Sequence, residues 1–142
     1  MVYIDTSVVV ALLTVEPMTR AVVRWFATLP EPPLASDWLL TEFASALAIK
    51  TRTGHVSAAQ ARRVRGEFDM LCASAFRLAA VSRAAFANAA TLVDEAVHGL
   101  SAGDALHLAV AKEAGATSIA TLDKTMLGNL KRLGFAAAPI AL

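Results

Sequence analysis

Short apolar stretches alternate with longer amphipathic stretches along the whole chain. The short stretches are rich in β-branched and aromatic residues, which is typical of buried strands. They predict strands at Val2–Ile4, Leu34–Ala35, Phe76–Val81, Thr117–Leu122 and Phe135–Ile140. Between them, apolar residues recur at helical spacing, and capping residues, prolines and glycines mark the ends. These stretches predict helices over Val8–Leu13, Met18–Leu29, Asp37–Thr51, Ser57–Ala73, Ser82–Gly99, Ser101–Gly115 and Lys124–Leu133.

The alternation of strands and helices predicts the fold class. Strands separated by helices are joined by right-handed crossovers, which make the strands parallel and place helices on both faces of the sheet. We therefore expect an α/β fold, a three-layer α/β/α sandwich around a central and mostly parallel sheet. The sequence contains no repeat, low-complexity tract or linker, so residues 1–142 are expected to form a single domain.

The composition is apolar, with 56% hydrophobic and 18% charged residues. Much of the apolar fraction is alanine, and no apolar run approaches the roughly 18 residues that a membrane-spanning helix needs. Met1–Leu13 lacks a basic start and contains Asp5, so it is not expected to be a signal peptide. The single cysteine, Cys72, excludes an internal disulfide and suits a reducing cytosol. We expect a cytoplasmic protein without a membrane segment, part of whose apolar surface is covered by another protein.

Two acidic residues lie directly after predicted strands. Asp5 follows the first strand, and Asp123 follows the fourth. The carboxyl ends of parallel strands share one edge of a sheet, where ligands bind in open α/β folds. Each acid can also be a simple helix cap, and Thr6 or Ser7 is expected to cap the helix that follows Asp5. The position alone therefore leaves a structural role and a chemical role open.

Two further acids lie on helices with apolar surroundings. Glu42 is on a mostly apolar stripe where only the Ser45 hydroxyl can meet it, and a buried carboxylate needs a positive or donating partner. The simpler alternative is a partly exposed Glu42 bonded to Ser45. Asp104 lies in the first turn of a helix that is apolar nearly all round, and it can form a capping pair with Ser101. Together with the two strand-end acids, they can converge on one end of the sheet.

A convergence of carboxylates indicates a particular chemistry. Carboxylates a few ångströms apart raise each other's pKa, and a divalent cation removes that penalty. Oxygen ligands without a cysteine or histidine cluster select a hard ion, Mg²⁺ or Mn²⁺. One or two such ions activate water and stabilise the leaving oxygen in phosphodiester hydrolysis. The residues therefore favour a metal-dependent phosphodiesterase.

The acids lie within segments that resemble a known family. The segments are YIDTSVVVALL at the start, LLTEFASAL around Glu42, SAGDALHLAVA around Asp104 and IATLD ending at Asp123. With them, the chain resembles PIN-domain ribonucleases, and among these the VapC-type toxins of bacterial toxin–antitoxin pairs. The resemblance implies a PIN-like fold, metal-dependent endonucleolytic cleavage of RNA, homodimerisation and inhibition by a cognate VapB-like antitoxin.

The resemblance also implies roles for individual residues. Four acids are expected to be the catalytic and metal-binding residues of a Mg²⁺ site that Mn²⁺ can also occupy: Asp5, Glu42, Asp104 and Asp123. The hydroxyls of Thr6 and Thr121 match positions beside such a site. Candidates for an antitoxin groove are the following: Trp25, Phe26 and Trp38 with the Arg20 and Arg24 face. Core packing is the simpler role for the aromatic side chains.

RNA binding needs a basic surface, and the net charge of +1 provides little of one. The candidate RNA-binding residues form a cluster on one predicted helix: Arg62, Arg63 and Arg65. Lys131 and Arg132 can add to it. The simpler alternative is an ordinary solvated face.

Three other functions compete with the nuclease. Asp104 with His107 and Glu95 with His98 match the acid-x-x-His pairs of di-iron proteins, but the predicted strands do not suit the helix bundle that such sites need. His107 is expected instead to be a packed helix residue with one satisfied nitrogen.

The second alternative is phosphoryl transfer to Asp5 in a receiver-like switch or a phosphatase, with Lys124 binding phosphate. Ser7 stands where such phosphatases usually have a second acid. The third is a non-enzymatic interaction module whose acids are only helix caps, and it predicts no response to divalent metals.

Overall fold

One five-stranded sheet runs through the computed structural model, which describes residues 1–142, and every neighbouring pair of strands is parallel. The strands are β1 (Val2–Ile4), β2 (Leu34–Ser36), β3 (Arg77–Ala79), β4 (Ser118–Ala120) and β5 (Ala136–Ala137). Their order in space is β3-β2-β1-β4-β5, so the first strand of the chain lies at the centre of the sheet. The predicted fold class is confirmed, although the last three strands are shorter than predicted.

Seven α-helices and one 3₁₀ turn flank the sheet. They are α1 (Thr6–Leu13), α2 (Thr19–Ala27), α3 (Trp38–Arg52), α4 (Ala58–Ser74), α5 (Arg83–Asp94), η1 (Ala96–His98), α6 (Ala102–Glu113) and α7 (Lys124–Leu130). The helix predicted to reach Gly99 ends at Asp94, because a 3₁₀ turn follows it. Gly99 itself has a φ of 70°, a left-handed conformation that glycine adopts without strain. The last helix ends at Leu130, before the predicted Leu133.

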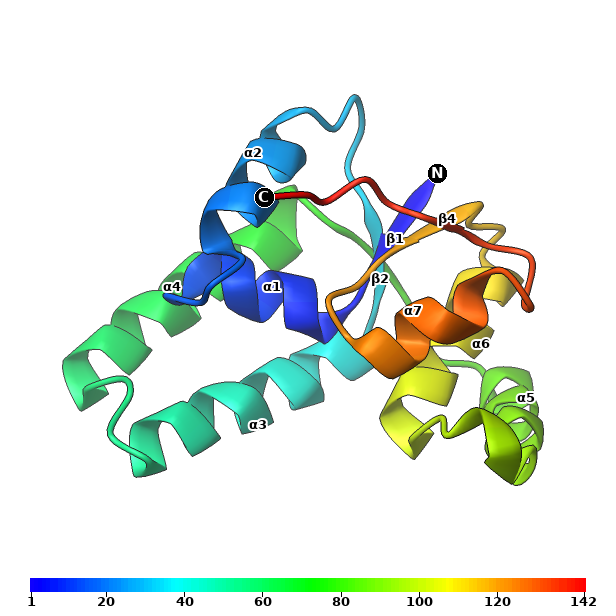
Figure 1. The fold of residues 1–142 in the computed structure, drawn as a ribbon. Coiled ribbons are helices and arrows are strands. Elements are labelled where there is room, and N and C mark those ends of the chain that lie inside the picture. The colour runs from blue at the N-terminus through cyan, green and yellow to red at the C-terminus, as the bar shows by residue number, and fades with distance from the viewer.

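Side chains alternate across the sheet and divide the core into two halves. Tyr3 and Ile119 pack on the face covered by α5 and α6, whereas the next residues along the chain, Ile4 and Ala120, pack on the face covered by α1 to α4. Figure 1 shows these two groups of helices on opposite sides of the sheet. Helix α6 is buried throughout Ala105–Ala111, which explains its nearly all-apolar sequence. The three-layer arrangement is therefore as predicted.

Capping residues fix where the helices begin. Asp5 is the N-cap of α1, because its side chain accepts a hydrogen bond of 3.3 Å from the backbone N–H of Val8. The prediction of Thr6 or Ser7 as this cap is wrong, since α1 already begins at Thr6. Ser57 forms a capping box with Gln60 at the start of α4, where a helix was predicted to begin, and Ser101 caps α6 as predicted. The helix that begins directly after Asp5 holds this carboxylate at the carboxyl end of the central strand.

None of the helices combines the length and the apolar character needed to cross a membrane.

Candidate active site

Asp5 is a buried carboxylate at the end of the central strand, with an exposed fraction of only 3%. Its Oδ1 accepts a hydrogen bond from the Ser7 hydroxyl (2.6 Å), and its Oδ2 accepts one from the Thr121 hydroxyl (2.6 Å). Burial raises the pKa of Asp5, and although the bonds from Ser7 and Thr121 act in the opposite direction, the net pKa stays raised. The two hydroxyls therefore fix the orientation of a carboxylate that is poorly solvated.

Asp104 and Asp123 lie near this carboxylate on the starts of two other helices. Asp123 caps α7 by accepting a hydrogen bond of 2.7 Å from the N–H of Met126. Asp104 lies in the first turn of α6, three residues after the Ser101 cap. Its pKa is raised to about 6, mainly by partial burial and further by the negative charges of Asp123 and Asp5. These three carboxylates therefore share one negatively charged region at the carboxyl edge of the sheet.

Glu42 reaches the same edge from α3 but makes different contacts. Its Oε1 accepts a hydrogen bond from the Thr6 hydroxyl (2.6 Å) and another from His107 Nε2 (2.5 Å). Partial burial raises the pKa of Glu42, but the bonds from His107 and Thr6 outweigh it, so the net pKa lies below its ordinary value. The alternative partner from the sequence, Ser45, is exposed and does not bind Glu42.

His107 is the residue near the site whose role the sequence did not predict. The expectation of one satisfied nitrogen is wrong, because Nδ1 lies 2.7 Å from the Tyr3 hydroxyl and Nε2 lies 2.5 Å from Glu42. One signal for this role was present in the sequence. His107 follows Asp104 by three residues, which puts both side chains on the same face of α6.

The donor set fits a hard divalent cation by its chemistry, since all four acids supply oxygen. No three His, Cys, Asp or Glu side chains are arranged as ligands, however. Both oxygens of Asp5 and one oxygen of Glu42 are engaged with neighbouring hydroxyls or with His107. The residues that would hold a cation at this edge are Asp104 and Asp123 together with Asp5 and Glu42.

The two alternative chemistries find less support in these contacts. Asp5 is almost fully buried with both oxygens bonded, which does not suit an accessible nucleophile. Glu95 is exposed and pairs with Arg132 (3.3 Å) and His98 (3.5 Å), so it does not join Asp104 and His107 in one metal site.

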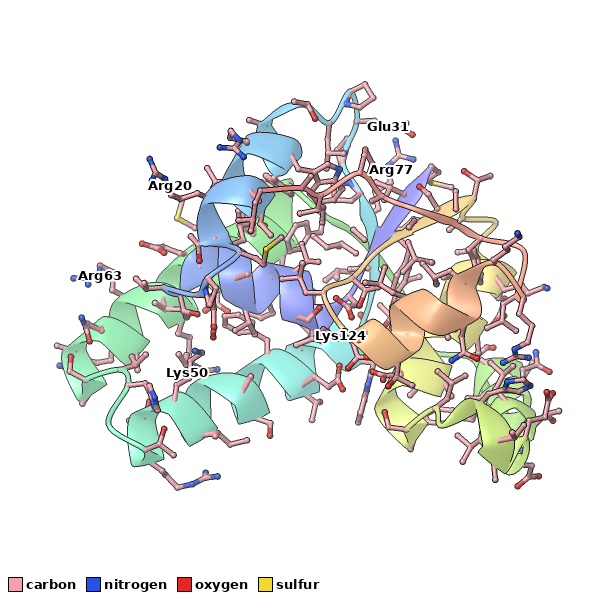
Figure 2. The ribbon with its side chains drawn as sticks, viewed as in Figure 1. Arg20, Glu31, Lys50, Arg63, Arg77 and Lys124 are labelled. Atoms are coloured by element: carbon pink, nitrogen blue, oxygen red, sulfur yellow. The ribbon has the colours of Figure 1, made fainter.

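The predicted basic and aromatic residues lie elsewhere. The three arginines on α4 are exposed, and Figure 2 shows Arg63 far from Lys124, which directly follows Asp123. Trp25 is buried in the core, and Phe26 packs edge-on against Phe76 at a ring-centroid distance of 6.1 Å. Trp25 and Phe26 thus take the core role, and the RNA-binding role of the arginines stays a prediction.

The parallel sheet with acidic residues at its carboxyl edge makes this chain an α/β domain with a candidate metal site. A protein-family model matches the same chain. The PIN domain model matches residues 2–133, so the chain belongs to the PIN domain family. No curated protein matches the chain.

Solved structures resemble the chain over nearly its whole length. The Sarcin-Ricin loop cleaving toxin VapC20 from Mycobacterium tuberculosis has a TM-score of 0.74 at 20% identity, with 96% of this chain and 97% of that chain covered. FitAcB from Neisseria gonorrhoeae has a TM-score of 0.73 at 19% identity, with 96% of each chain covered. A toxin–antitoxin complex from Klebsiella pneumoniae has a TM-score of 0.62 at 19% identity, with 90% of this chain and 92% of that chain covered. At these identities the likeness shows a shared fold.

Proposed function

We propose that this chain is a divalent-metal-dependent endoribonuclease and acts as the toxin of a toxin–antitoxin pair. One observation carries the proposal: Asp5, Asp104 and Asp123 come from three different parts of the chain to one edge of the sheet, where partial burial, and then the charges of Asp123 and Asp5, raise the pKa of Asp104. Such an arrangement is unfavourable until a cation neutralises it, and Mg²⁺ or Mn²⁺ suits oxygen ligands.

The residues of the site have different roles in the proposed hydrolysis of a phosphodiester bond. A divalent cation bound there supplies an activated water and neutralises charge at the scissile phosphate. Ser7 and Thr121 hold the two oxygens of Asp5 in fixed directions. Asp104 is partly exposed, so an RNA phosphate would be able to reach a cation bound beside it. Thr6 and His107 hold one oxygen of Glu42.

The proposal includes a second copy of the chain and an antitoxin in the cytoplasm. The apolar side chains of Phe86 and Val93 are 56% and 36% exposed, and with Trp38 and Leu106 they line a cavity of about 380 Å³. An exposed apolar surface of this kind suits a homodimer contact. The proposal of an antitoxin partner is supported by the structural relatives, which include FitAB bound to the IR36 DNA fragment and the Klebsiella pneumoniae toxin–antitoxin complex.

Cation removal tests the proposed activity directly. We expect the purified chain to cleave structured RNA with Mg²⁺ or Mn²⁺ and to lose this activity in EDTA, because the carboxylates alone do not activate water. Product analysis on gels measures the cleavage, and an Asp104→Asn chain purified in parallel controls for contaminating nuclease. Equal cleavage with and without EDTA would contradict the proposal.

Gly103 provides a separate test of Glu42. A Cβ at Gly103 would lie 2.6 Å from Glu42 Oε2 and 3.3 Å from Trp38 Nε1, so Gly103→Ala must displace the carboxylate. We expect a modest fall in melting temperature, because the displaced carboxylate weakens its bonds from Thr6 and His107, and a fall in cleavage of roughly tenfold or more.

The matched control is Gly66→Ala on α4, where a Cβ meets nothing within 4 Å. It should stabilise the helix by up to about 1 kcal/mol without changing cleavage. If Gly103→Ala and Gly66→Ala cleave RNA equally well, the position of the Glu42 carboxylate does not matter for cleavage, and Glu42 is not part of the active site.

A further inference from the structure

A chain of hydrogen bonds leads from the centre of the sheet to Glu42. The Tyr3 hydroxyl lies 2.7 Å from His107 Nδ1, and His107 Nε2 lies 2.5 Å from Glu42 Oε1. Thr6 donates to the same oxygen of Glu42. Tyr3 and His107 are 0% and 1% exposed, so the bonds are shielded from water. Three elements, β1, α6 and α3, are thereby connected through side chains at the edge of the site.

The direction of each bond follows from what the groups can donate. The Tyr3 hydroxyl carries a proton at neutral pH and can donate it to Nδ1. Nδ1 then accepts, and the ring proton lies on Nε2. Ionised Glu42 can only accept, so Nε2 donates to Oε1. One tautomer of His107 satisfies every group in the chain.

The second oxygen of Glu42, Oε2, lies beside the first turn of α6. With Oε1 held by two donors, only Oε2 is left for another partner. Oε2 lies against Gly103, the residue before Asp104 in the first turn of α6. A long and partly exposed glutamate would otherwise lose side-chain entropy on binding a ligand. The hydrogen bonds restrict it in advance.

We propose that His107, oriented by Tyr3, is a positioning residue that holds Glu42 Oε1 and thereby presents Oε2 to the cation. The inference rests on the proposed function, in which Glu42 contributes to the cation site. His107 does not itself bind the cation, because it is buried and both of its nitrogens are engaged. Partners that orient metal ligands typically change metal affinity by roughly 10–100-fold when they are lost.

Two amide variants separate the two nitrogens of His107. The amide nitrogen of His107→Gln occupies about the place of Nε2 and can donate to Glu42. His107→Asn keeps an acceptor for Tyr3 but has no atom that reaches Glu42. We expect His107→Asn to weaken Mn²⁺ binding by roughly 10–100-fold, measured by electron paramagnetic resonance, and His107→Gln to stay close to the wild type. In a Glu42→Gln background, His107→Asn should have no further effect.

Equal Mn²⁺ affinities for His107→Asn and His107→Gln would overturn the positioning role and leave only packing. The proposed function is tested separately by Asp104→Asn. If Asp104→Asn weakens Mn²⁺ binding and His107→Asn does not, the positioning role fails and the nuclease site stands. If the wild type does not bind Mn²⁺, both proposals fail.

A spectroscopic measurement on the wild type does not depend on whether the variants fold. Nitrogen-15 spectra of the histidine ring should show the proton of His107 on Nε2. Tyr3→Phe keeps the ring volume but removes the donor to Nδ1, and it should release this tautomer and weaken Mn²⁺ binding. A proton on Nδ1 in the wild type would contradict the proposal.

Discussion

Asp104→Asn is expected to reduce RNA cleavage by at least about 100-fold, since metal-ion stabilisation of a phosphodiester transition state is worth several kcal/mol and each 1.4 kcal/mol is about tenfold in rate. The amide has nearly the shape of the carboxylate but lacks the negative charge that holds a cation. Asp104 is suited to this test because its influence on the fold is small: it lies in the first turn of α6, and the Ser101 cap contacts its backbone N–H. Initial cleavage rates at saturating Mg²⁺ measure the effect.

The matched control is Asp69→Asn, which removes the same charge from an exposed position on α4. It should cleave RNA as the wild type does. If both variants lose activity to the same extent, the loss reflects net charge and weaker RNA attraction. If neither loses activity, Asp104 has no part in the reaction.

Local patterns in the sequence predicted most of the fold. The alternation of Tyr3 and Ile4, buried on opposite faces of the sheet, follows from a short apolar strand with helices on both sides. Caps such as Ser57 and Ser101 have sequence signatures and were found at the predicted positions. Helix ends were less well predicted, because the end of α5 depends on a 3₁₀ turn that has no strong signature.

The four candidate acids could be recognised because a strand end or an apolar helix makes a carboxylate conspicuous. The partner of Glu42 could not be recognised in the same way. Glu42 and His107 are 65 residues apart, and they meet only because α3 and α6 approach the same edge of the sheet. Arg63 is conspicuous in the sequence, and Figure 2 shows it far from Lys124, which directly follows Asp123; its RNA-binding role stays a prediction.

The stability of the cation-free protein should depend on pH through Asp104. Its pKa is about 6 in the folded protein and about 3.9 in an unfolded chain. Below about pH 4 the carboxyl is protonated in both states and has no effect. As the pH rises, the unfolded state ionises first, so the free energy of unfolding falls until about pH 7. The two-unit difference corresponds to at most about 3 kcal/mol, and the partial exposure of Asp104 reduces this to about 1–2 kcal/mol.

Asp104→Asn should therefore be more stable than the wild type at pH 7.5 without metal, by about 3–8 °C in melting temperature, and equal to it near pH 4. Asp5 is less suitable for this comparison, because an amide there would disturb the bonds from Ser7, Thr121 and Val8. Mg²⁺ should close or reverse the difference, since a ligand at 100 times its Kd stabilises by about 2.7 kcal/mol and only the wild type binds it well. Thermal unfolding of both proteins at pH 4 and pH 7.5, each with EDTA and with Mg²⁺, measures these differences in melting temperature. A wild type that is the more stable protein in EDTA at pH 7.5 would show that neither burial nor the neighbouring carboxylates penalise the charge of Asp104, and the physical reason for a cation at this edge would be lost.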